Sequence, residues 1–329
     1  MTTADLPNLQ NGFVARPPTT DDLDELAALL IAYERAHTGK ASWQAPAARE
    51  WIASVWATVG FEVARDARVI VAPTGEVAGY ITVWRTEETS GHVVSSPRTL
   101  PPFDALGLDV ALLHWAESLA RQKAAALPSA VAATLNTWVD GPDAATEAML
   151  TREGFRLAQR YLRMQLLMRT PPPAPAWPAG VVARPFVAGQ NERTVYDVMQ
   201  AAFAGAYDYD ISYEEWRHEV FAPERMDPAL WTLATDGEAL VGAIISRTDT
   251  DDDGQMGWLE DVGVHPAWRQ RGLGLAMLHH SLGVFYERGI RRCGLSVDAH
   301  NASGAVRLYE RIGMIAQPHQ AIRYMKALR

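Results

Sequence analysis

The sequence predicts an α/β fold made of two copies of one domain, each a mixed, mostly antiparallel sheet flanked by helices. Three observations support this prediction. The chain has 329 residues, about twice the usual length of a single domain. The segment 170–180 carries five prolines in eleven residues, which favours an extended linker and divides the chain almost in half. Three short motifs also recur in the same order on both sides of that segment.

The recurring motifs define the extent of the two copies. They are VARP at 14–17 and 182–185, GEVAGYI at 75–81 and GEALVGAI at 237–244, and REGF at 152–155 and RIGM at 311–314. Each match is short, but a common order is much less expected by chance. We therefore expect a first domain at 1–169, a proline-rich linker at 170–180 and a second domain at 181–329.

The hydrophobic pattern of the second half predicts helices alternating with strands. Asp236-Gly237 and Asp253-Gly254 supply turns between successive strands. Gly289 is typical of a helix end, and Asn301 can cap a helix start. The expected helices are 191–204, 213–221, 273–288 and 301–312, and the expected strands are 229–236, 239–248, 256–264, 291–298 and 321–327.

The helix expected at 273–288 has the clearest pattern. Leu275, Leu278, Leu282 and Phe285 recur at three- and four-residue spacing, which places them on one stripe. This helix separates two expected strands, 256–264 and 291–298, and such a crossover joins parallel neighbours. The result is a mixed sheet.

Composition and charge exclude several classes of protein. The 30 Lys+Arg and 39 Asp+Glu give a formal charge of −9, which argues against nucleic-acid binding and suits a cationic small substrate. No apolar stretch reaches the ~18 residues of a membrane span, and the chain start lacks a signal-like pattern. We expect no membrane association and a cytoplasmic location. The lone Cys293 excludes an intramolecular disulfide and a CxxC metal site, and we interpret it as core packing.

The segment 259–275 carries the most informative chemistry. Arg269-x-x-Gly272-x-Gly274 lies between an expected strand and an expected helix. Glycines there allow a tight turn, and free N–H groups at a helix start favour an anion such as a pyrophosphate. A Walker loop needs Gly-Lys-Ser/Thr, which this segment lacks, and the dinucleotide fingerprint needs a third glycine near Met277, which is also missing. Neither motif therefore fits. A plain strand–turn–helix junction remains the alternative.

A second motif lies downstream and completes a resemblance to a family. The run Leu308-Tyr-Glu-Arg-Ile-Gly-Met314 follows Asn301 and Ala305. Together with Val262-Gly-Val264-His-Pro266 and the loop after it, this run resembles the GNAT superfamily of acetyl-CoA-dependent N-acetyltransferases. The likeness covers 181–329 with specific motifs and 13–169 in diluted form. Methionine replaces the family's phenylalanine at Met314, which preserves apolar bulk.

The resemblance implies a set of binding roles for acetyl-CoA as cosubstrate, with no metal. The strand edge Val262, Gly263 and Val264 would bind the pantetheine arm. The loop residues would hold the pyrophosphate, and Asn301 would contact the pantetheine side. The loop residues are Arg269, Gln270, Arg271, Gly272, Leu273 and Gly274.

The resemblance also places Tyr309 at the family's usual proton-donor position. Helical spacing independently puts Ala302, Ala305 and Tyr309 on one inward face. A tyrosine near the sulfur atom of acetyl-CoA can protonate the coenzyme A thiolate as it leaves. Glu260 and Asp261 alternate faces on one strand, so Glu260 would share a face with Val262 and Val264 and is the favoured base. A solvated carboxylate or deprotonation through water are the alternatives.

Other candidates in the second half have simpler interpretations. His279 and His280 are adjacent on one helix, so they cannot ligate a metal as i,i+4 residues would, and surface or packing roles are favoured. The acidic run 249–254 fits a solvated hairpin loop better than a polyamine or aminosugar site. Residues 207–216 combine aromatic and acidic side chains that suit an amine acceptor, but core packing explains Trp216 equally well.

The first copy lacks the corresponding chemistry. The repeat places Leu150 opposite Tyr309 and Pro142 opposite Asn301, and only Gly107 remains between 97 and 107, where the second copy has its glycine loop. We therefore expect 1–169 to be a degenerate copy that lends structure or part of the acceptor cleft. An inert coenzyme A bound there is the alternative.

The favoured function is acetyl transfer from acetyl-CoA to a primary amine of a small molecule, by direct attack on the thioester. The layout, a weakened copy followed by an intact one, is similar to that of the mycothiol synthases, which implies a cysteinyl pseudodisaccharide as an alternative acceptor. A non-catalytic acyl-CoA-binding sensor is a further alternative from another class. We expect a monomer or homodimer whose partner is the small-molecule amine.

Overall fold

The structure is a computed structural model that divides the chain into two compact units. Unit 1 comprises residues 1–161 and 318–329, and unit 2 comprises residues 162–317. The structure describes all residues except 1–5, 7–8, 10, 40–42, 59, 86–90, 142, 205–211, 222–226, 250–255 and 301–303. In the described part, no helix combines the length and the hydropathy that a membrane crossing requires.

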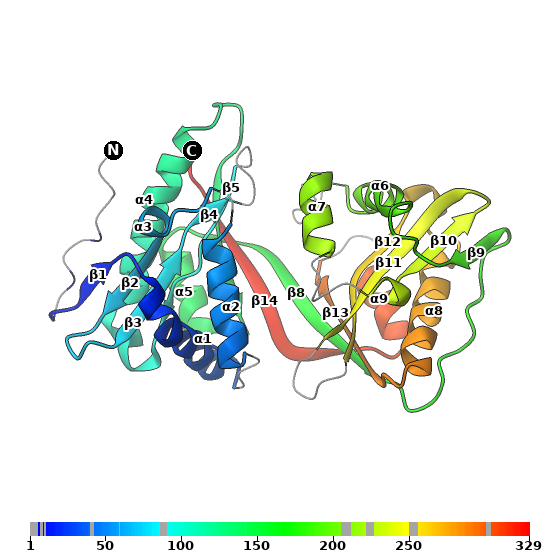
Figure 1. The fold of residues 1–329 in the computed structure, drawn as a ribbon, viewed down its shortest axis with the longest axis horizontal. Helices are drawn as coiled ribbons and strands as arrows, with labels where there is room; N and C mark the ends of the chain where they lie inside the picture. The colour runs from blue at the N-terminus through cyan, green and yellow to red at the C-terminus, as the bar shows by residue number, and fades with distance from the viewer. Residues whose placement is uncertain are drawn as a thin grey trace. The chain divides into compact units, whose positions relative to one another are not determined.

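Unit 1 contains two groups of paired strands and five helices among its described residues (Figure 1). One group runs β1-β2-β3-β6 and the other β4-β5-β7-β14-β8. Its helices are α1 (Leu23–Thr38), α2 (Ala45–Trp56), α3 (Val63–Asp66), α4 (Leu108–Ala125) and α5 (Ala144–Arg152). Its strands are β1 (Val14–Arg16), β2 (Ala67–Val71), β3 (Val77–Thr82), β4 (Trp84–Arg85), β5 (His92–Val94), β6 (Arg98–Thr99), β7 (Thr134–Asp140) and β8 (Arg156–Leu167).

Unit 2 has its strands in the order β8-β13-β12-β11-β10-β9. The pairs β9–β10, β10–β11 and β11–β12 are antiparallel, whereas β12 and β13 are parallel, so the sheet is mixed as predicted. Its strands are β9 (Val181–Arg184), β10 (Thr232–Asp236), β11 (Ala239–Asp249), β12 (Met256–Val264) and β13 (Arg292–Asp298), together with the second half of β8. The strand β14 (Ile315–Ala327) has residues 315–317 in unit 2 and its remaining residues in unit 1. Its helices are α6 (Glu192–Ala202), α7 (Tyr213–Val220), α8 (Leu273–Glu287) and α9 (Ala305–Arg311).

The repeated motifs occupy equivalent places in the two units. The VAR residues form β1 in unit 1 and the end of β9 in unit 2. The two GE-containing segments lead into β3 and β11. Gly154 and Gly313 end α5 and α9 with left-handed backbones, φ +83° and +91°. The chain is therefore a tandem repeat of one fold, as its sequence predicts.

Two strands differ from the sequence-based division of the chain. The residues of β14 after Gln317 belong to unit 1, where Ala321–Ala327 pairs antiparallel with β7. In the strand order, β14 lies between β7 and β8. Figure 1 shows β14 in red and β8 in green. The second half of β8 belongs to unit 2. Met168, just after β8, donates its N–H to the Arg291 carbonyl at 2.7 Å. The last strand of each copy is thus divided between the two units.

Residues of β14 complete the core of unit 1. Ile322 and Tyr324 of β14, and Leu328 directly after it, are buried within the main hydrophobic cluster of this unit. Arg323 is also buried, and its guanidinium donates to Asn136 Oδ1 at 2.7 Å and to Gln159 Oε1 at 2.9 Å. Buried polar groups of this kind stabilise a fold only while their partners are in place. The pairing of β14 is therefore fixed by both packing and hydrogen bonds.

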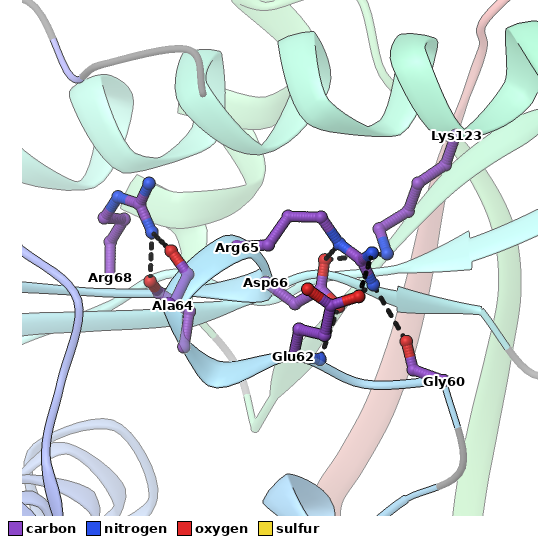
Figure 2. Close-up of polar contacts among 8 residues, drawn as sticks. Gly60, Glu62, Ala64, Arg65, Asp66, Arg68 and Lys123 are labelled. Carbon is purple, nitrogen blue, oxygen red and sulfur yellow. Dashed lines mark hydrogen bonds and ion pairs between the residues drawn. The ribbon is translucent and has the colours of Figure 1, made fainter. Parts of the chain in front are cut away.

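A buried carboxylate ties α3 to α4 inside unit 1 (Figure 2). Asp66 is fully buried and forms ion pairs with Arg65 and Lys123, both at 2.7 Å. Burial alone would raise the pKa of this carboxyl, but hydrogen bonds from Arg65 and Lys123 outweigh it and lower the pKa. Arg65 also donates to the Gly60 carbonyl and to Glu62. Asp66 therefore stays ionised and structural.

The helix α8 follows its predicted pattern with one difference. Leu278, Leu282 and Phe285 are buried against the sheet, but Leu275 is only partly buried. Leu273, Ala276 and Met277 fill the remaining core positions instead. Gly289 ends the helix with φ +81°, the left-handed conformation expected there. Cys293 is fully buried in the same cluster, and burial raises the pKa of its thiol, so core packing is confirmed.

Candidate active site

The strand β12 has a β-bulge at Glu260. Ile245 pairs with Asp261 and Ser246 pairs with Leu259, so Glu260 is the extra residue without a cross-strand partner. A bulge inserts one residue and shifts the alternation of side chains beyond it. Leu259 and Val262, three residues apart, consequently pack into the same cluster as α8.

The bulge overturns the expected face of Glu260. The prediction that Glu260 shares a face with Val262 and Val264 is wrong, because the inserted residue breaks strict alternation. Asp261 is paired with Ile245, which packs with α6, and Glu260 bonds Arg247, two residues from Ile245, at 2.6 Å. Both carboxylates therefore lie on the α6 side of the sheet, whereas the sequence allowed only one of them to do so.

The strands β12 and β13 separate beyond Trp258. Their parallel pairing joins Met256–Trp258 to Arg292–Gly294 and continues no further among the described residues. From Asp261 to Val264, β12 is paired on its other side with β11. The backbone groups on the β13 side of Val262, Gly263 and Val264 are thus placed to bind an extended ligand.

The loop before α8 combines a helix N-terminus with left-handed residues. Gln270 and Gly272 have φ +61° and +81°, and Gly272 is the N-cap residue of α8. Successive N–H groups in such conformations form a concavity that binds anions, and the dipole of α8 adds to it. Apart from its own chain neighbours and helix backbone, no atom of the described residues lies within 4 Å of the place where a Cβ of residue 272 would stand, so that part of the structure leaves space above the loop.

Gly274 has a packing role that differs from that of Gly272. A Cβ at Gly274 would stand 3.2 Å from Leu308 Cδ2, so the missing side chain lets α9 approach α8. Leu273, the first residue of α8, is buried in the core of unit 2. The two glycines of the motif therefore serve the loop conformation and the helix contact, respectively.

Arg269 and Arg271 both interact with the protein itself. Arg269 donates to the Ala202 carbonyl at 2.7 Å and to the Val264 carbonyl at 3.4 Å. It therefore fastens the loop to the end of α6 and to β12. The Arg271 guanidinium lies over the Trp268 ring, 4.8 Å from its centroid. Asn301 lies outside the described residues.

Tyr309 lies on α9, next to the loop and the separated strands. Its side chain is 7% exposed and belongs to the same cluster as Leu273 and Met277 of α8. Burial raises the pKa of its hydroxyl, and the negative charge of Asp261 raises it further. The phenol is therefore protonated throughout the neutral and mildly alkaline range.

The aromatic residues around α6 and α7 form a core. Trp216 is buried among Tyr196, Tyr213, Phe221 and Trp231. Arg193 covers the rings of Tyr196 and Tyr213, at 5.4 and 5.0 Å from their centroids. Core packing therefore explains Trp216. The neighbouring predicted acceptor residues 207–210 lie outside the described residues, as does most of the acidic run 249–254.

The two adjacent histidines of α8 differ in surroundings. His280 packs beside Trp177 of the proline-rich segment, with ring centroids 5.7 Å apart. Burial lowers the pKa of both His279 and His280, so both are mainly neutral at neutral pH. Across the described positions, no cluster of three or more His, Cys, Asp or Glu side chains could hold a metal ion.

Comparison with known proteins identifies the class. A profile of the Acetyltransferase (GNAT) family matches residues 193–314, which contain the bulge, the loop and Tyr309. The solved GCN5-related N-acetyltransferase of Sphaerobacter thermophilus is similar over 98% of both chains, at 30% identity and a TM-score of 0.80. The chain belongs to the GNAT family and is an N-acetyltransferase.

More specific likenesses follow from two further comparisons. The mycothiol acetyltransferase of Thermobispora bispora is 30% identical over 242 residues, 72% of this chain and 76% of the relative. A tandem GNAT protein from the clavulanic acid biosynthesis pathway shares the fold over 96% of this chain and 99% of its own, at 16% identity and a TM-score of 0.68. Both likenesses extend across the two units.

Proposed function

We propose that unit 2 transfers an acetyl group from acetyl-CoA to a primary amine of a small molecule, with Tyr309 as general acid. One observation carries this proposal: a buried tyrosine with a raised pKa shares a hydrophobic cluster with the helix whose start has left-handed residues suited to an anion. The amine nitrogen attacks the thioester carbonyl, the C–S bond breaks, and the Tyr309 proton passes to the departing thiolate. The amine loses one proton to a base or to water.

The described part of the site offers groups suited to coenzyme A. The Gln270 to Gly274 amides would hold the pyrophosphate, and the free edge of Val262 to Val264 would bind the pantetheine amides. Arg269 would act by holding the loop in place, since its guanidinium is engaged with two backbone carbonyls. The same strand edge would donate an N–H to the oxyanion that forms during attack.

Glu260 remains the proposed base, and the bulge adds Asp261 as a rival. Glu260 accepts a hydrogen bond from Arg247 at 2.6 Å, which holds its carboxylate on the α6 side of the sheet. After burial, the negative charge of Asp261 is the second cause that raises the pKa of Tyr309, so the Asp261 carboxylate interacts electrostatically with the proposed proton donor. The pH profiles of Glu260→Gln and Asp261→Asn distinguish the two, because loss of the base removes the acidic limb of kcat.

The acceptor is tested by measuring free thiol released from acetyl-CoA in the presence of different amines. We expect turnover with a primary amine of an aminosugar or cysteinyl conjugate. The likeness to mycothiol acetyltransferases favours a cysteinyl pseudodisaccharide as the second candidate acceptor. The acceptor with the highest kcat/KM among the amines tested is the better candidate. Acetyl-CoA binding with no transfer to any amine would contradict the proposal and favour a non-catalytic sensor.

Substituting Gly272 tests the proposed pyrophosphate loop. We expect Gly272→Glu to weaken coenzyme A binding by at least about 100-fold, because a carboxylate would enter the open space that the anion needs. The measurement is calorimetric titration with coenzyme A. Gly289→Glu is the matched control, since Gly289 has the same φ of +81° and equally open surroundings at the far end of α8. Equal affinities of the two variants would refute the loop assignment.

The position of unit 1 that the repeat places opposite Tyr309 carries a leucine, which cannot donate a proton. This residue, Leu150, is a buried core residue. We propose that unit 1 is a degenerate copy that does not catalyse acetyl transfer. A variant of Tyr309 that retained full activity would contradict this division of labour.

A further inference from the structure

Unit 1 contains a cavity that the acetyl-transfer chemistry does not use. Its volume is about 260 Å³, slightly below the ~300–1,000 Å³ typical of pockets for drug-sized ligands. It is lined by residues of α1, α2, β6 and the end of β7, together with Trp43 before α2. A cavity of this size suits a small molecule and is too small for a whole coenzyme.

Aromatic rings form one side of the cavity. Trp43 and Trp51 lie with ring centroids 5.8 Å apart, and Tyr33 joins them in the lining. Trp51 is unusually exposed for a large aromatic side chain, at 36%. Aromatic surfaces left accessible in this way bind apolar or flat groups, and they attract cations.

The same cavity carries charges of both signs. The Arg98 guanidinium lies 5.8 Å from the Tyr33 ring centroid, and the Asp140 carboxylate lines the wall with it. With the residues that the structure describes, neither side chain forms a hydrogen bond or an ion pair, although both are partly buried. Partly buried charges without partners are costly, and a ligand that pairs with them recovers that cost.

Glu34 adds a second carboxylate at the aromatic side. Its Oε2 accepts the backbone N–H of Trp43 at 3.3 Å, which fixes the start of the segment leading into α2. The lining therefore holds two carboxylates and one guanidinium beside the aromatic rings. A simple cation would leave Arg98 unpaired, and a simple anion would leave Asp140 unpaired.

We infer that this cavity binds a small zwitterion, an α-amino acid with an aromatic or large apolar side chain. Arg98 pairs with its carboxylate through the planar guanidinium fork. Asp140, with Glu34 nearby, accepts from its ammonium group, and the side chain lies against Trp43 and Trp51. The first copy would then act as a ligand-binding unit, independently of the acetyl-transfer function proposed for unit 2.

The experiment is calorimetric titration of the whole chain, carrying Tyr309→Phe to prevent turnover, with three matched probes. L-Tryptophan carries both charges, tryptamine lacks the carboxylate, and indole-3-propionate lacks the ammonium group. We expect L-tryptophan to bind and each analogue to bind about 10- to 100-fold more weakly, the cost of one lost charge-assisted contact. Arg98→Met and Asp140→Asn should each weaken L-tryptophan binding by a similar factor.

Two controls keep the outcome decisive. Arg35→Met removes an exposed arginine from the same helix as Glu34, outside the cavity lining, and should leave binding unchanged. If Arg98→Met lowers the Tm, the isosteric Asp140→Asn decides. Absence of L-tryptophan binding up to millimolar concentration would overturn the inference. Tryptamine binding as tight as that of L-tryptophan would overturn it in favour of a cation site.

Discussion

Replacing Tyr309 with phenylalanine is expected to lower kcat for acetyl transfer by about 10²- to 10⁴-fold, the usual contribution of a positioned general acid. The departing thiolate would have to leave without a proton donor. Affinity for acetyl-CoA should change little, because the ring remains and continues to pack with Leu273 and Met277. Steady-state rates of thiol release and calorimetric titration with acetyl-CoA measure the two quantities separately.

The pH dependence supplies a second readout for Tyr309. Burial and Asp261 raise the pKa of its hydroxyl above the ordinary value of about 10, so the protonated acid persists at every lower pH. We expect no alkaline loss of kcat from tyrosine ionisation below about pH 10. Tyr286→Phe is the matched control, since Arg291 covers the Tyr286 ring and would cover a phenylalanine equally. A Tyr309→Phe enzyme as active as Tyr286→Phe would refute the assignment.

Ending the chain at Gln317 is expected to abolish the cooperative folding of unit 1. The deletion removes the strand between β7 and β8 and exposes the main-chain groups of both neighbours. It also removes Ile322, Tyr324 and Leu328 from the core and leaves Asn136 and Gln159 without Arg323. Limited proteolysis followed by mass spectrometry should show cleavage within 12–161, where the whole chain is protected.

Two alanine variants of β14 test the same pairing more gently. Ile322 is fully buried, so Ile322→Ala should lower the free energy of unfolding by about 2–5 kcal/mol. Met325 on the same strand is 38% exposed, and Met325→Ala should cost roughly 1 kcal/mol or less. Chemical denaturation measures both losses of unfolding free energy, and the comparison holds when the two variants have equal m-values. Equal losses at the two positions would contradict the described packing of β14.

The strands and helices of unit 2 follow closely from sequence patterns. The strand predicted at 256–264 matches β12 residue for residue, because alternating apolar residues lie between a turn and a proline. Element ends were less predictable where short helical turns intervene. The strand expected from 229 begins at Thr232, since Pro228–Leu230 forms a single turn of 3-10 helix capped by Asp227.

The exchange of strands could not be read from the sequence. The repeat marks where each copy begins and ends, and the residues 321–327 are predicted to form a strand. Neither feature identifies the neighbour against which a strand pairs, because β7 and β8 offer backbone groups that carry no sequence signature. The two anchors that do specify the pairing, Asn136 and Gln159, are far from Arg323 in sequence.

The sequence singled out the individual segments of the candidate site but not their arrangement in space. Glycine chemistry located the loop, and the helical position of Tyr309 located the buried hydroxyl. The bulge at Glu260 was missed, because no glycine or proline marks it and the apolar alternation is continuous on both sides. The cavity of unit 1 was also missed, since its residues come from separate elements and share no motif.

Because β14 is synthesised long after the rest of unit 1, unit 1 cannot complete its sheet until the second copy has been translated. A ribosome adds roughly 5–20 residues per second, so residue 318 follows residue 161 after roughly 8–31 s. During that interval unit 1 has been synthesised apart from β14, and the edge of β7 that β14 will cover is open to other chains. Nascent chains on one messenger would meet each other in this state. Fast translation of the second copy therefore shortens the time during which the first copy can aggregate through the open edge of β7.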